Sequence, residues 1–336
     1  MTGKGGLLQM FPQHGAQVIR GNLQRAYLNF QALPGLVRIL PYLRASETLI
    51  FFGGAPGDDL LCTTLLVEQA ARGRRPCGVM TRHAAIFQGN PGVAKAIPFA
   101  PHSLGLVRAL GKSVIELSYC ERNEALDQDT SPDEHILSIL CRKASVSGEI
   151  SLRPHIFLTP DEIKKGAIGD RQVVVQSGAT GANFPMRNKE WYPERFQSVV
   201  DALRDKFQVI QLGAESDPPL KGVLDLRGKT TMREAGAVLA NSMVFVGLVG
   251  FLMHLARAVD CRSVIVYGGR ERPWQSGYIC NTNLTGDTAC SPCWRWNTCD
   301  YDRECMKLIS PDAVISGAFE QLEKFGTPLE CEKALI

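Results

Sequence analysis

Two adjacent acids follow a glycine-rich turn near the start of the chain, in the segment GGAPGDDLLCTTLL at residues 53–66. The apolar run ETLIFF precedes it, so the order predicted is strand, turn and helix. Turns of this kind usually hold a phosphate, but Asp58 and Asp59 would repel one. Either the turn is a nucleotide cradle that tolerates acids, or the acids cap the helix, or one of them is there to do chemistry.

Two familiar nucleotide motifs are absent. The GxGxxG dinucleotide fingerprint does not follow the first strand, where the order is Gly53, Gly54, Ala55, Pro56, Gly57. The segment GKT at 228–230 lacks the glycine that a Walker A loop requires five positions before Gly228. An ATPase and a dehydrogenase are therefore both disfavoured.

A second group with chemical potential is the segment CSPCWRWNTCDYDREC, which contains Cys290, Cys293, Cys299 and Cys305. Four thiolates in one short loop suit a tetrahedral zinc or iron ion, although the spacing is not that of a zinc finger. We interpret the quartet as ligands of a structural metal in a Cys-rich loop at 290–305 that braces the cleft. Reduced free thiols or a pair of disulfides are the alternatives.

Composition limits the class of protein that must position these groups. The 336 residues suit two domains, and 45% hydrophobic and 21% charged residues are ordinary for a soluble protein. A net charge of +3 gives no reason to expect nucleic acid as a partner. The chain begins without a recognisable signal peptide and has no apolar stretch of the ~20 residues that span a bilayer, so we expect a reducing cytoplasm.

Residues 1–46 contain no Asp or Glu but carry Lys4 and four arginines among many apolar residues. We interpret them as a basic N-terminal helical extension, broken around Pro34 and Pro41. Such a segment can lie on an anionic membrane surface or pack on the core as an arm. The first reading predicts a protein that is peripheral at the inner membrane.

Strands alternate with helices in two successive series, which predicts an α/β fold with two parallel sheets. The first series runs through TLIFFGG, PCGVMT, VAKAIPF and KSVIELSY, and a polar stretch ends it near Pro154. The second runs from RQVVVQSG through FQVIQLG, GVLDLRG and MVFVGL to RSVIVYGG, with a capped C-terminal helix at SPDAVISGAFEQLEKF. Ligand binding is expected between the domains, at the carboxyl ends of the strands.

Six blocks in order resemble the glycosyltransferase family 9, which includes the ADP-heptose:lipopolysaccharide heptosyltransferases. The blocks are GAPGDDLLCTTLL, GNPGVAKAI, QSGATGANFPMRNKEWYPERFQSVVDAL, VIQLGAESD, LDLRGKTTMREAGAVLANSMVFVGLVGFLMHLARAV and SVIVYGGRERP. The resemblance implies a GT-B architecture, with two Rossmann-like domains facing a central cleft. It places an acceptor domain at 47–165 and a nucleotide-sugar domain at 166–325.

The resemblance also implies the reaction and the residues that perform it. An acceptor hydroxyl attacks the anomeric carbon with inversion and a nucleoside diphosphate leaves, with no divalent ion or other cofactor required. Asp58 matches the family's catalytic acid and would be the general base, while Asp59 would only cap the helix. The expected donor contacts in the strand ends and loops of the second domain are Ser177, Gly178, Arg187, Lys189 and Glu215.

The sequence departs from the family pattern at VGLVGFLMHLA, where Val249, Gly250 and Phe251 replace an acid, a hydroxyl residue and a glycine. This departure puts the identity of the sugar nucleotide in doubt. A helix N-terminus with Gly250, and with His254 in the first turn, can still bind a diphosphate through backbone N–H groups. His254 is equally well read as a core histidine.

These features together predict a cytoplasmic heptosyltransferase whose partners are an ADP-heptose-like donor and a glycan or lipid-linked acceptor of lipopolysaccharide type. The resemblance leaves two alternatives. One is a protein heptosyltransferase of the autotransporter type, since relatives of that kind carry a similar cysteine quartet associated with bound iron. The other is a non-catalytic relative that binds a metal or a nucleotide.

Overall fold

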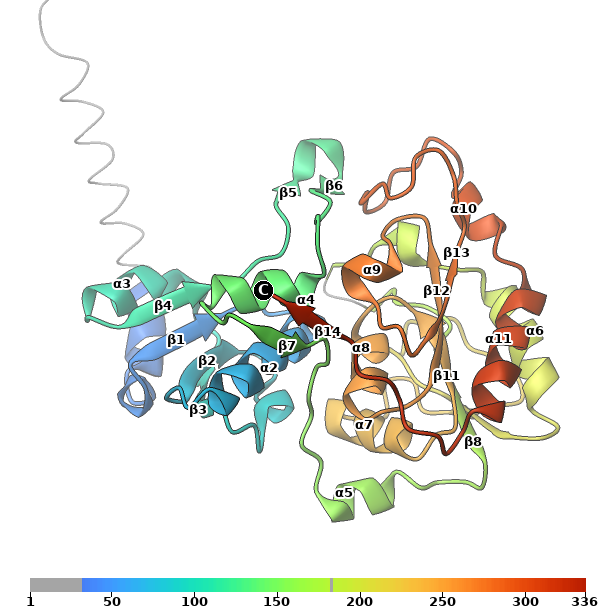
Figure 1. Ribbon diagram of the computed structural model, residues 1–336, viewed down its shortest axis with the longest axis horizontal. Coiled ribbons are helices and arrows are strands. Elements are labelled where there is room, and N and C mark those ends of the chain that lie inside the picture. The colour runs from blue at the N-terminus through green and yellow to red at the C-terminus, as the bar shows by residue number, and fades with distance from the viewer. Residues whose placement is uncertain (1–31, 182–183) are drawn as a thin grey trace, which may run out of the picture.

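The protein folds into two α/β domains that lie side by side in a computed structural model, which describes residues 32–181 and 184–336 (Figure 1). The first domain holds a parallel sheet in the order β3-β2-β1-β4. Its strands are β1 (Thr48–Phe51), β2 (Cys77–Thr81), β3 (Val93–Pro98) and β4 (Ser113–Glu116). Helices α2 (Pro56–Ala71), α3 (Leu104–Ala109) and α4 (Ile136–Lys143) complete this domain.

The second domain holds a six-stranded sheet in the order β10-β9-β8-β11-β12-β13, and every neighbouring pair is parallel. Its strands are β8 (Gln172–Val175), β9 (Gln208–Gln211), β10 (Leu224–Asp225), β11 (Phe245–Leu248), β12 (Ser263–Gly268) and β13 (Thr282–Thr285). Two parallel sheets in tandem confirm the α/β class predicted from the alternating pattern. The sequence pattern did not predict β13.

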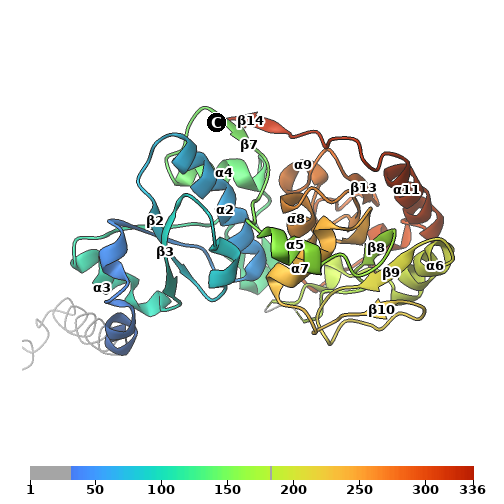
Figure 2. The ribbon, with the colours of Figure 1, turned by 90° about the horizontal axis from the view of Figure 1, so that it is seen from below.

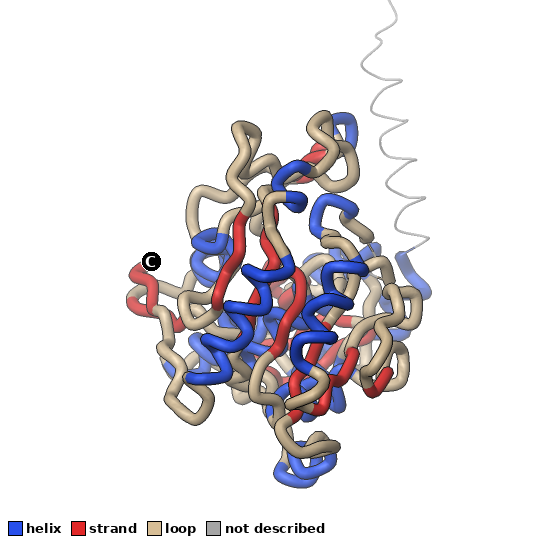
Figure 3. Tube along the Cα trace, turned by 90° about the vertical axis from the view of Figure 1, so that its right-hand side faces the viewer, coloured by secondary structure: helices blue, strands red, loops and turns tan. Residues whose placement is uncertain are grey.

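Helices cover both faces of the second sheet. Helices α6 (Pro193–Leu203) and α11 (Pro311–Glu323) pack against each other on the outer face (Figure 3). Helices α7 (Met232–Ala240) and α8 (Phe251–Ala258) lie on the side that faces the first domain (Figure 1). Shorter helices α5 (Pro160–Lys165), α9 (Pro273–Ser276) and α10 (Glu304–Lys307) occupy the connections.

One apolar core runs across the two domains. Leu60 and Leu61 of α2 belong to the same buried cluster as Leu252 and Met253 of α8. The two helices approach closely at their N-termini, because a Cβ on Gly57 would lie 3.9 Å from the backbone nitrogen of Phe251. This contact brings the predicted catalytic turn against the second domain.

A hairpin of the first domain reaches the Cys-rich loop of the second (Figure 1). It consists of β5 (Arg122–Asn123) and β6 (Gln128–Asp129), which are antiparallel. The N–H of Asp129 donates to the carbonyl of Trp294 at 3.0 Å, and the N–H of Trp296 donates to the carbonyl of Asp127 at 2.9 Å. The sequence pattern indicated only a polar stretch here, so this hairpin is a finding of the structure.

The C-terminus returns to the first domain. Strand β14 (Lys333–Leu335) pairs antiparallel with β7 (Glu149–Ser151), as the view in Figure 2 makes clear. The predicted limit of the second domain at residue 325 leaves out this crossing segment. The chain therefore connects the domains at both its middle and its end.

The described part of the predicted N-terminal extension packs on the first domain. Residues 32–39 are helical, and Pro34 lies among them rather than at a break. Ile39 and Leu43 are buried in a small core with Met80, whereas Leu33 and Val37 are exposed. The prediction for residues 1–31 lies outside the described residues. Within the described residues, no helix combines the length and the apolar character that crossing a membrane requires.

Candidate active site

The chemistry predicted from the sequence maps to a cavity of about 360 Å³ between the two domains. Its walls include the first residues of α2, α7 and α8, and the loops after β8 and β9. Positive partial charges of helix N-termini therefore converge on one space. Helices α2 and α8 have no side chain that caps them by a hydrogen bond, whereas Thr231 caps α7 in a capping box with Glu234.

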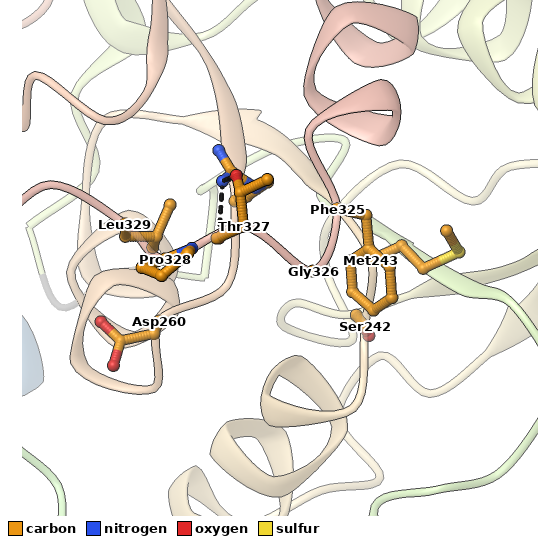
Figure 4. Close-up of a pocket in the computed structure, with 9 residues that line it drawn as sticks. Ser242, Met243, Asp260, Phe325, Gly326, Thr327, Pro328 and Leu329 are labelled. Carbon is orange, nitrogen blue, oxygen red and sulfur yellow. Dashed lines mark hydrogen bonds between the residues drawn. The ribbon is translucent and has the colours of Figure 1, made fainter.

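A smaller hollow of about 280 Å³ lies elsewhere, between the ends of α7 and α11 (Figure 4). Its charged groups already have partners. Arg262 donates to the carbonyl of Thr327 at 2.8 Å, and Asp260 pairs with Arg153 at 2.7 Å and with Arg257 at 2.6 Å. The inter-domain cavity is therefore the better candidate for a reaction.

Asp58 lies in the first turn of α2 and lines the cavity. The pKa of its carboxyl is raised to about 7: burial is the largest cause and the neighbouring charge of Asp59 acts in the same direction, while Arg122 and Lys189 act against them. A carboxyl with this pKa is half ionised near neutral pH and can accept a proton from a substrate. The position and the pKa both suit the predicted general base.

Asp59 does not cap the helix. Its carboxylate is buried and accepts a hydrogen bond from the Thr81 hydroxyl at 2.6 Å, and it lies 2.8 Å from Nδ1 of His83. The helix N-cap is Ala55, without a side-chain hydrogen bond. The capping role assigned from the sequence is therefore wrong, because the 100° turn between the two acids directs Asp59 to strand β2 instead.

Lys189 reaches the cavity from the 3₁₀ turn Arg187–Lys189. Its Nζ lies 2.8 Å from Oε1 of Glu271. Burial lowers the pKa of the Lys189 ammonium, and the Glu271 carboxylate acts in the opposite direction. The contact with Glu271 thus holds Lys189 in the cavity wall, where the sequence predicted a contact with the donor.

Arg122 is a second cation in the wall of the cavity, and the sequence reasoning missed it. It comes from the β5–β6 hairpin, and its guanidinium carbon lies 4.7 Å from the centre of the Phe184 ring. Phe184 in turn packs edge-on against Trp296 of the Cys-rich loop, at 4.9 Å between ring centres. No role was assigned to this residue from the sequence, and it lies outside the six family blocks.

The strand end at residues 176–180 differs from the prediction. The Ser177 hydroxyl is buried and donates to the carbonyl of Pro218 at 2.5 Å, so it does not line the cavity. Two backbone N–H groups further along are also occupied, since Ala179 donates to Glu190 at 2.8 Å and Thr180 donates to Asp217 at 3.0 Å. Gly178 is buried between these contacts, and a Cβ there would clash with Pro218 at 2.9 Å. This loop is held by carboxylates rather than open to phosphate.

A different acid from the predicted one faces the cavity after β9. Glu215 is exposed and is not part of the cavity wall, whereas Asp217 lines it. Burial raises the pKa of Asp217, although its carboxylate accepts the N–H of Ala214 at 2.9 Å. Both acids occur in the block LGAESD, so the sequence located the segment but not the residue. Arg187 is likewise exposed, and its backbone N–H donates to the side-chain oxygen of Asn297 at 2.9 Å.

Gly250 and His254 both line the cavity, at the start of α8. His254 is buried, and its Nδ1 lies 2.6 Å from the Tyr278 hydroxyl oxygen. Burial lowers the pKa of His254 to about 3, with the nearby Lys189 charge acting in the same direction. The imidazole is therefore neutral at physiological pH. The sequence left open whether His254 is a core histidine or a residue of the donor site, and the structure shows a buried, hydrogen-bonded histidine that also lines the cavity.

The four cysteines of the 290–305 loop lie near one another as free thiols. Burial raises the pKa of Cys293, and the charges of Cys290 and Cys299 raise it further, while Cys293 and Cys299 do the same for Cys305. Within the described ranges 32–181 and 184–336, no group of three or more His, Cys, Asp or Glu side chains is arranged to hold a metal ion. The thiols as they stand do not form the predicted centre.

The sequence model of glycosyltransferase family 9 (heptosyltransferase) matches residues 80–299, so the chain belongs to this family. Lipopolysaccharide heptosyltransferase 3 of Escherichia coli is 28% identical over 138 residues, which are 35% of this chain and 38% of that protein. The matched region thus spans about two fifths of the curated relative.

Solved structures share the fold. ADP-heptose lps heptosyltransferase II of E. coli superposes with a TM-score of 0.63 at 14% identity, over 83% of this chain and 99% of that one. The iron-containing dodecameric glycosyltransferase TibC from enterotoxigenic E. coli H10407 gives 0.63 at 18% identity, over 83% of this chain and 78% of that one. These likenesses confirm the predicted GT-B architecture. TibC has also been solved in complex with ADP-D-beta-D-heptose.

Proposed function

We propose that this protein is an inverting glycosyltransferase that moves a heptose from ADP-heptose to a hydroxyl group of a lipopolysaccharide-type glycan. The observation that carries the proposal is Asp58, whose carboxyl has a pKa of about 7 in a cavity that also receives Lys189, Arg122 and helix N-termini. Family membership supports the reaction class, and the complex of TibC with ADP-D-beta-D-heptose supports the donor.

In the proposed reaction the Asp58 carboxylate takes the proton of the acceptor hydroxyl. The acceptor oxygen forms a bond to the anomeric carbon of the heptose, while the bond from that carbon to the diphosphate oxygen breaks. The electron pair of the broken bond leaves with ADP. Lys189, Arg122 and the uncapped N-terminus of α8 lie around the same cavity and stabilise the negative charge that develops there.

The donor region of the proposal differs from the one inferred from the sequence. The Ser177 hydroxyl and the N–H groups of Ala179 and Thr180 are engaged within the protein, so we assign the diphosphate to Lys189, Gly250 and the start of α8. Asp217 rather than Glu215 is the carboxylate that lines the cavity, but its two oxygens accept the N–H groups of Ala214 and Thr180, so we assign the ribose hydroxyls to neither acid.

A binding screen tests the donor without knowledge of the acceptor. ADP, UDP and GDP are titrated into the protein by calorimetry, followed by ADP-heptose with and without a heptose-acceptor glycan. The proposal expects ADP to bind more tightly than UDP and GDP, and expects acceptor-dependent release of ADP. Equal weak binding of all three diphosphates would refute the assignment of the donor.

The protein-acceptor alternative has its own support. TibC is iron-containing, and this chain carries four cysteines in one loop, whose Trp296 packs against Phe184 of the cavity wall. An autotransporter-type polypeptide would then replace the glycan as acceptor, with the same base and the same donor. Comparison of the two acceptor classes in the ADP-release assay distinguishes these proposals.

The structural metal remains a prediction that the arrangement of thiols does not support. If iron or zinc binds, it is held by Cys290, Cys293, Cys299 and Cys305 and has no part in the transfer step. Elemental analysis of protein purified under reducing conditions should then give close to one equivalent of a single metal per chain. Less than a few tenths of an equivalent would exclude the centre. A Cys293→Ser variant serves as the control that should lose the metal.

The basic extension at 1–46 gives a second proposed partner, the surface of the inner membrane. The exposed side chains of Leu33, Val37 and Leu40 in its described part are compatible with this contact. Co-sedimentation with anionic vesicles tests it, and equal recovery with neutral and anionic vesicles would contradict it.

A further inference from the structure

A row of buried ion pairs connects the hairpin of the first domain to the lysine in the cavity. Oδ2 of Asp129 lies 2.7 Å from Nη2 of Arg270, and Nη1 of Arg270 lies 2.8 Å from Oε1 of Glu271. The same Oε1 lies 2.8 Å from Nζ of Lys189. We call these four residues the relay.

The relay is fixed in place by further contacts. Arg270 donates from Nε to the carbonyl of Arg295 at 3.1 Å, and its guanidinium lies over the Trp294 ring at 4.7 Å. The Ser276 hydroxyl donates to Oε2 of Glu271 at 2.6 Å. Asp129, Arg270 and Glu271 are 5%, 2% and 3% exposed, so each charge depends on its neighbours for compensation.

The end of the relay in the first domain is anchored through the backbone. Asp129 is held against Trp294 by the hairpin, and Gln128 donates from Nε2 to the carbonyl of Cys293 at 2.7 Å. The same segment of the Cys-rich loop contacts the residue before Lys189, since the N–H of Asn188 donates to the carbonyl of Trp296 at 3.0 Å. The side chains of the relay and these backbone hydrogen bonds thus both link the hairpin to the turn that carries Lys189.

We propose that Asp129 is a positioning residue for the donor: it holds Arg270, Arg270 holds Glu271, and Glu271 directs Lys189 toward the leaving diphosphate. The inference rests on the proposed function, since it assigns Lys189 to the donor. It makes the first domain part of the donor site, because the cation of the second domain is set by an acid of the first.

The electrostatics agree with this geometry. The carboxylate of Asp129 raises the pKa of both Lys189 and Asp58. The other charges that act on Asp58 are those of Asp59, Arg122 and Lys189. Removal of the Asp129 charge is therefore expected to lower the pKa of the proposed base without any direct contact.

A charge-conserving variant tests the geometry of the relay. In Arg270→Lys a single ammonium group cannot reach both carboxylates, so Lys189 loses its fixed partner. We expect ADP to bind about fivefold to tenfold more weakly, as measured by calorimetry. Arg272→Lys is the matched control, because Arg272 pairs with the exposed Asp287 outside the relay, and its affinity should stay within about twofold of wild type. Equal affinities of the two variants would overturn the inference.

A pH titration of the Asp58 carboxyl, without any ligand, tests the Asp129 end of the relay. In protein labelled with ¹³C at the aspartate carboxyl groups, NMR should give a midpoint near pH 7 for Asp58, a signal identified by its loss in Asp58→Ala. Asp129→Asn should lower this midpoint by about half a pH unit, whereas Glu124→Gln, on the same hairpin but exposed, should leave it unchanged. An unchanged midpoint in folded Asp129→Asn would overturn the inference. The NMR titration needs no ligand, so it tests the relay independently of the donor. If the wild-type protein binds no ADP in the calorimetry, the proposed function fails, whatever the titration shows.

Discussion

Replacing Asp58 with asparagine is expected to lower kcat for heptose transfer about 10³-fold, which is the range for loss of a general base. Asparagine has almost the same shape but cannot accept the proton of the acceptor hydroxyl. The affinity for ADP should be unchanged or slightly higher, because a negative charge is removed from the cavity proposed to hold the diphosphate. Steady-state transfer from ADP-heptose and calorimetry with ADP measure the two quantities separately.

The matched control is Asp133→Asn, the same change at an exposed position of the first domain. Its kcat should stay within about twofold of wild type, as expected for a surface substitution. If Asp58→Asn retained a tenth or more of the wild-type kcat, Asp58 would not be the base, and another group in the cavity would have to take the proton.

Replacing Lys189 with methionine is expected to weaken ADP binding about tenfold to a hundredfold, the range for loss of a charged hydrogen-bond donor. Methionine keeps the unbranched shape of the side chain and removes the charge. Glu271 still has Arg270 at 2.8 Å and Ser276 at 2.6 Å, so the buried carboxylate keeps partners and the fold should persist. Calorimetry measures the loss of affinity, and thermal unfolding checks the fold.

Lys164→Met controls for the loss of one positive charge, since Lys164 is exposed on α5, away from the cavity. Its affinity for ADP should equal that of wild type within about twofold. If the two lysine variants bound ADP equally well, Lys189 would serve only to compensate Glu271, and the donor phosphates would lie elsewhere.

The sequence predicted the elements whose signals are local. The apolar run before Gly53 and the helix after Gly57 are found as β1 and α2, within a few residues of the expected limits. The C-terminal helix begins after Ser310, whose hydroxyl accepts the N–H of Ala313 at 3.2 Å, as the capping pattern predicted. Side-chain periodicity and caps involve neighbours in the chain, so one sequence is enough to read them.

Contacts between distant residues could not be predicted in this way. Nothing in the polar stretch around Asp129 indicates that it meets Arg270, 141 residues later. The choice between Glu215 and Asp217 depends on how the loop turns after β9, and the local sequence pattern does not specify that turn. The pairing of β14 with β7 likewise joins segments more than 180 residues apart. These features depend on tertiary packing rather than on local pattern.

The most direct test of Asp58 as the base is the pH dependence of kcat/KM for ADP-heptose. The base acts as a carboxylate, and burial raises its pKa to about 7. As the pH falls through this value Asp58 becomes protonated and loses its function, so kcat/KM should level off above pH 7 and fall about tenfold per unit below it. A profile that stays flat from about pH 5 to 8 would indicate a carboxyl with an ordinary pKa, or no carboxyl at all, and would contradict the assignment of Asp58.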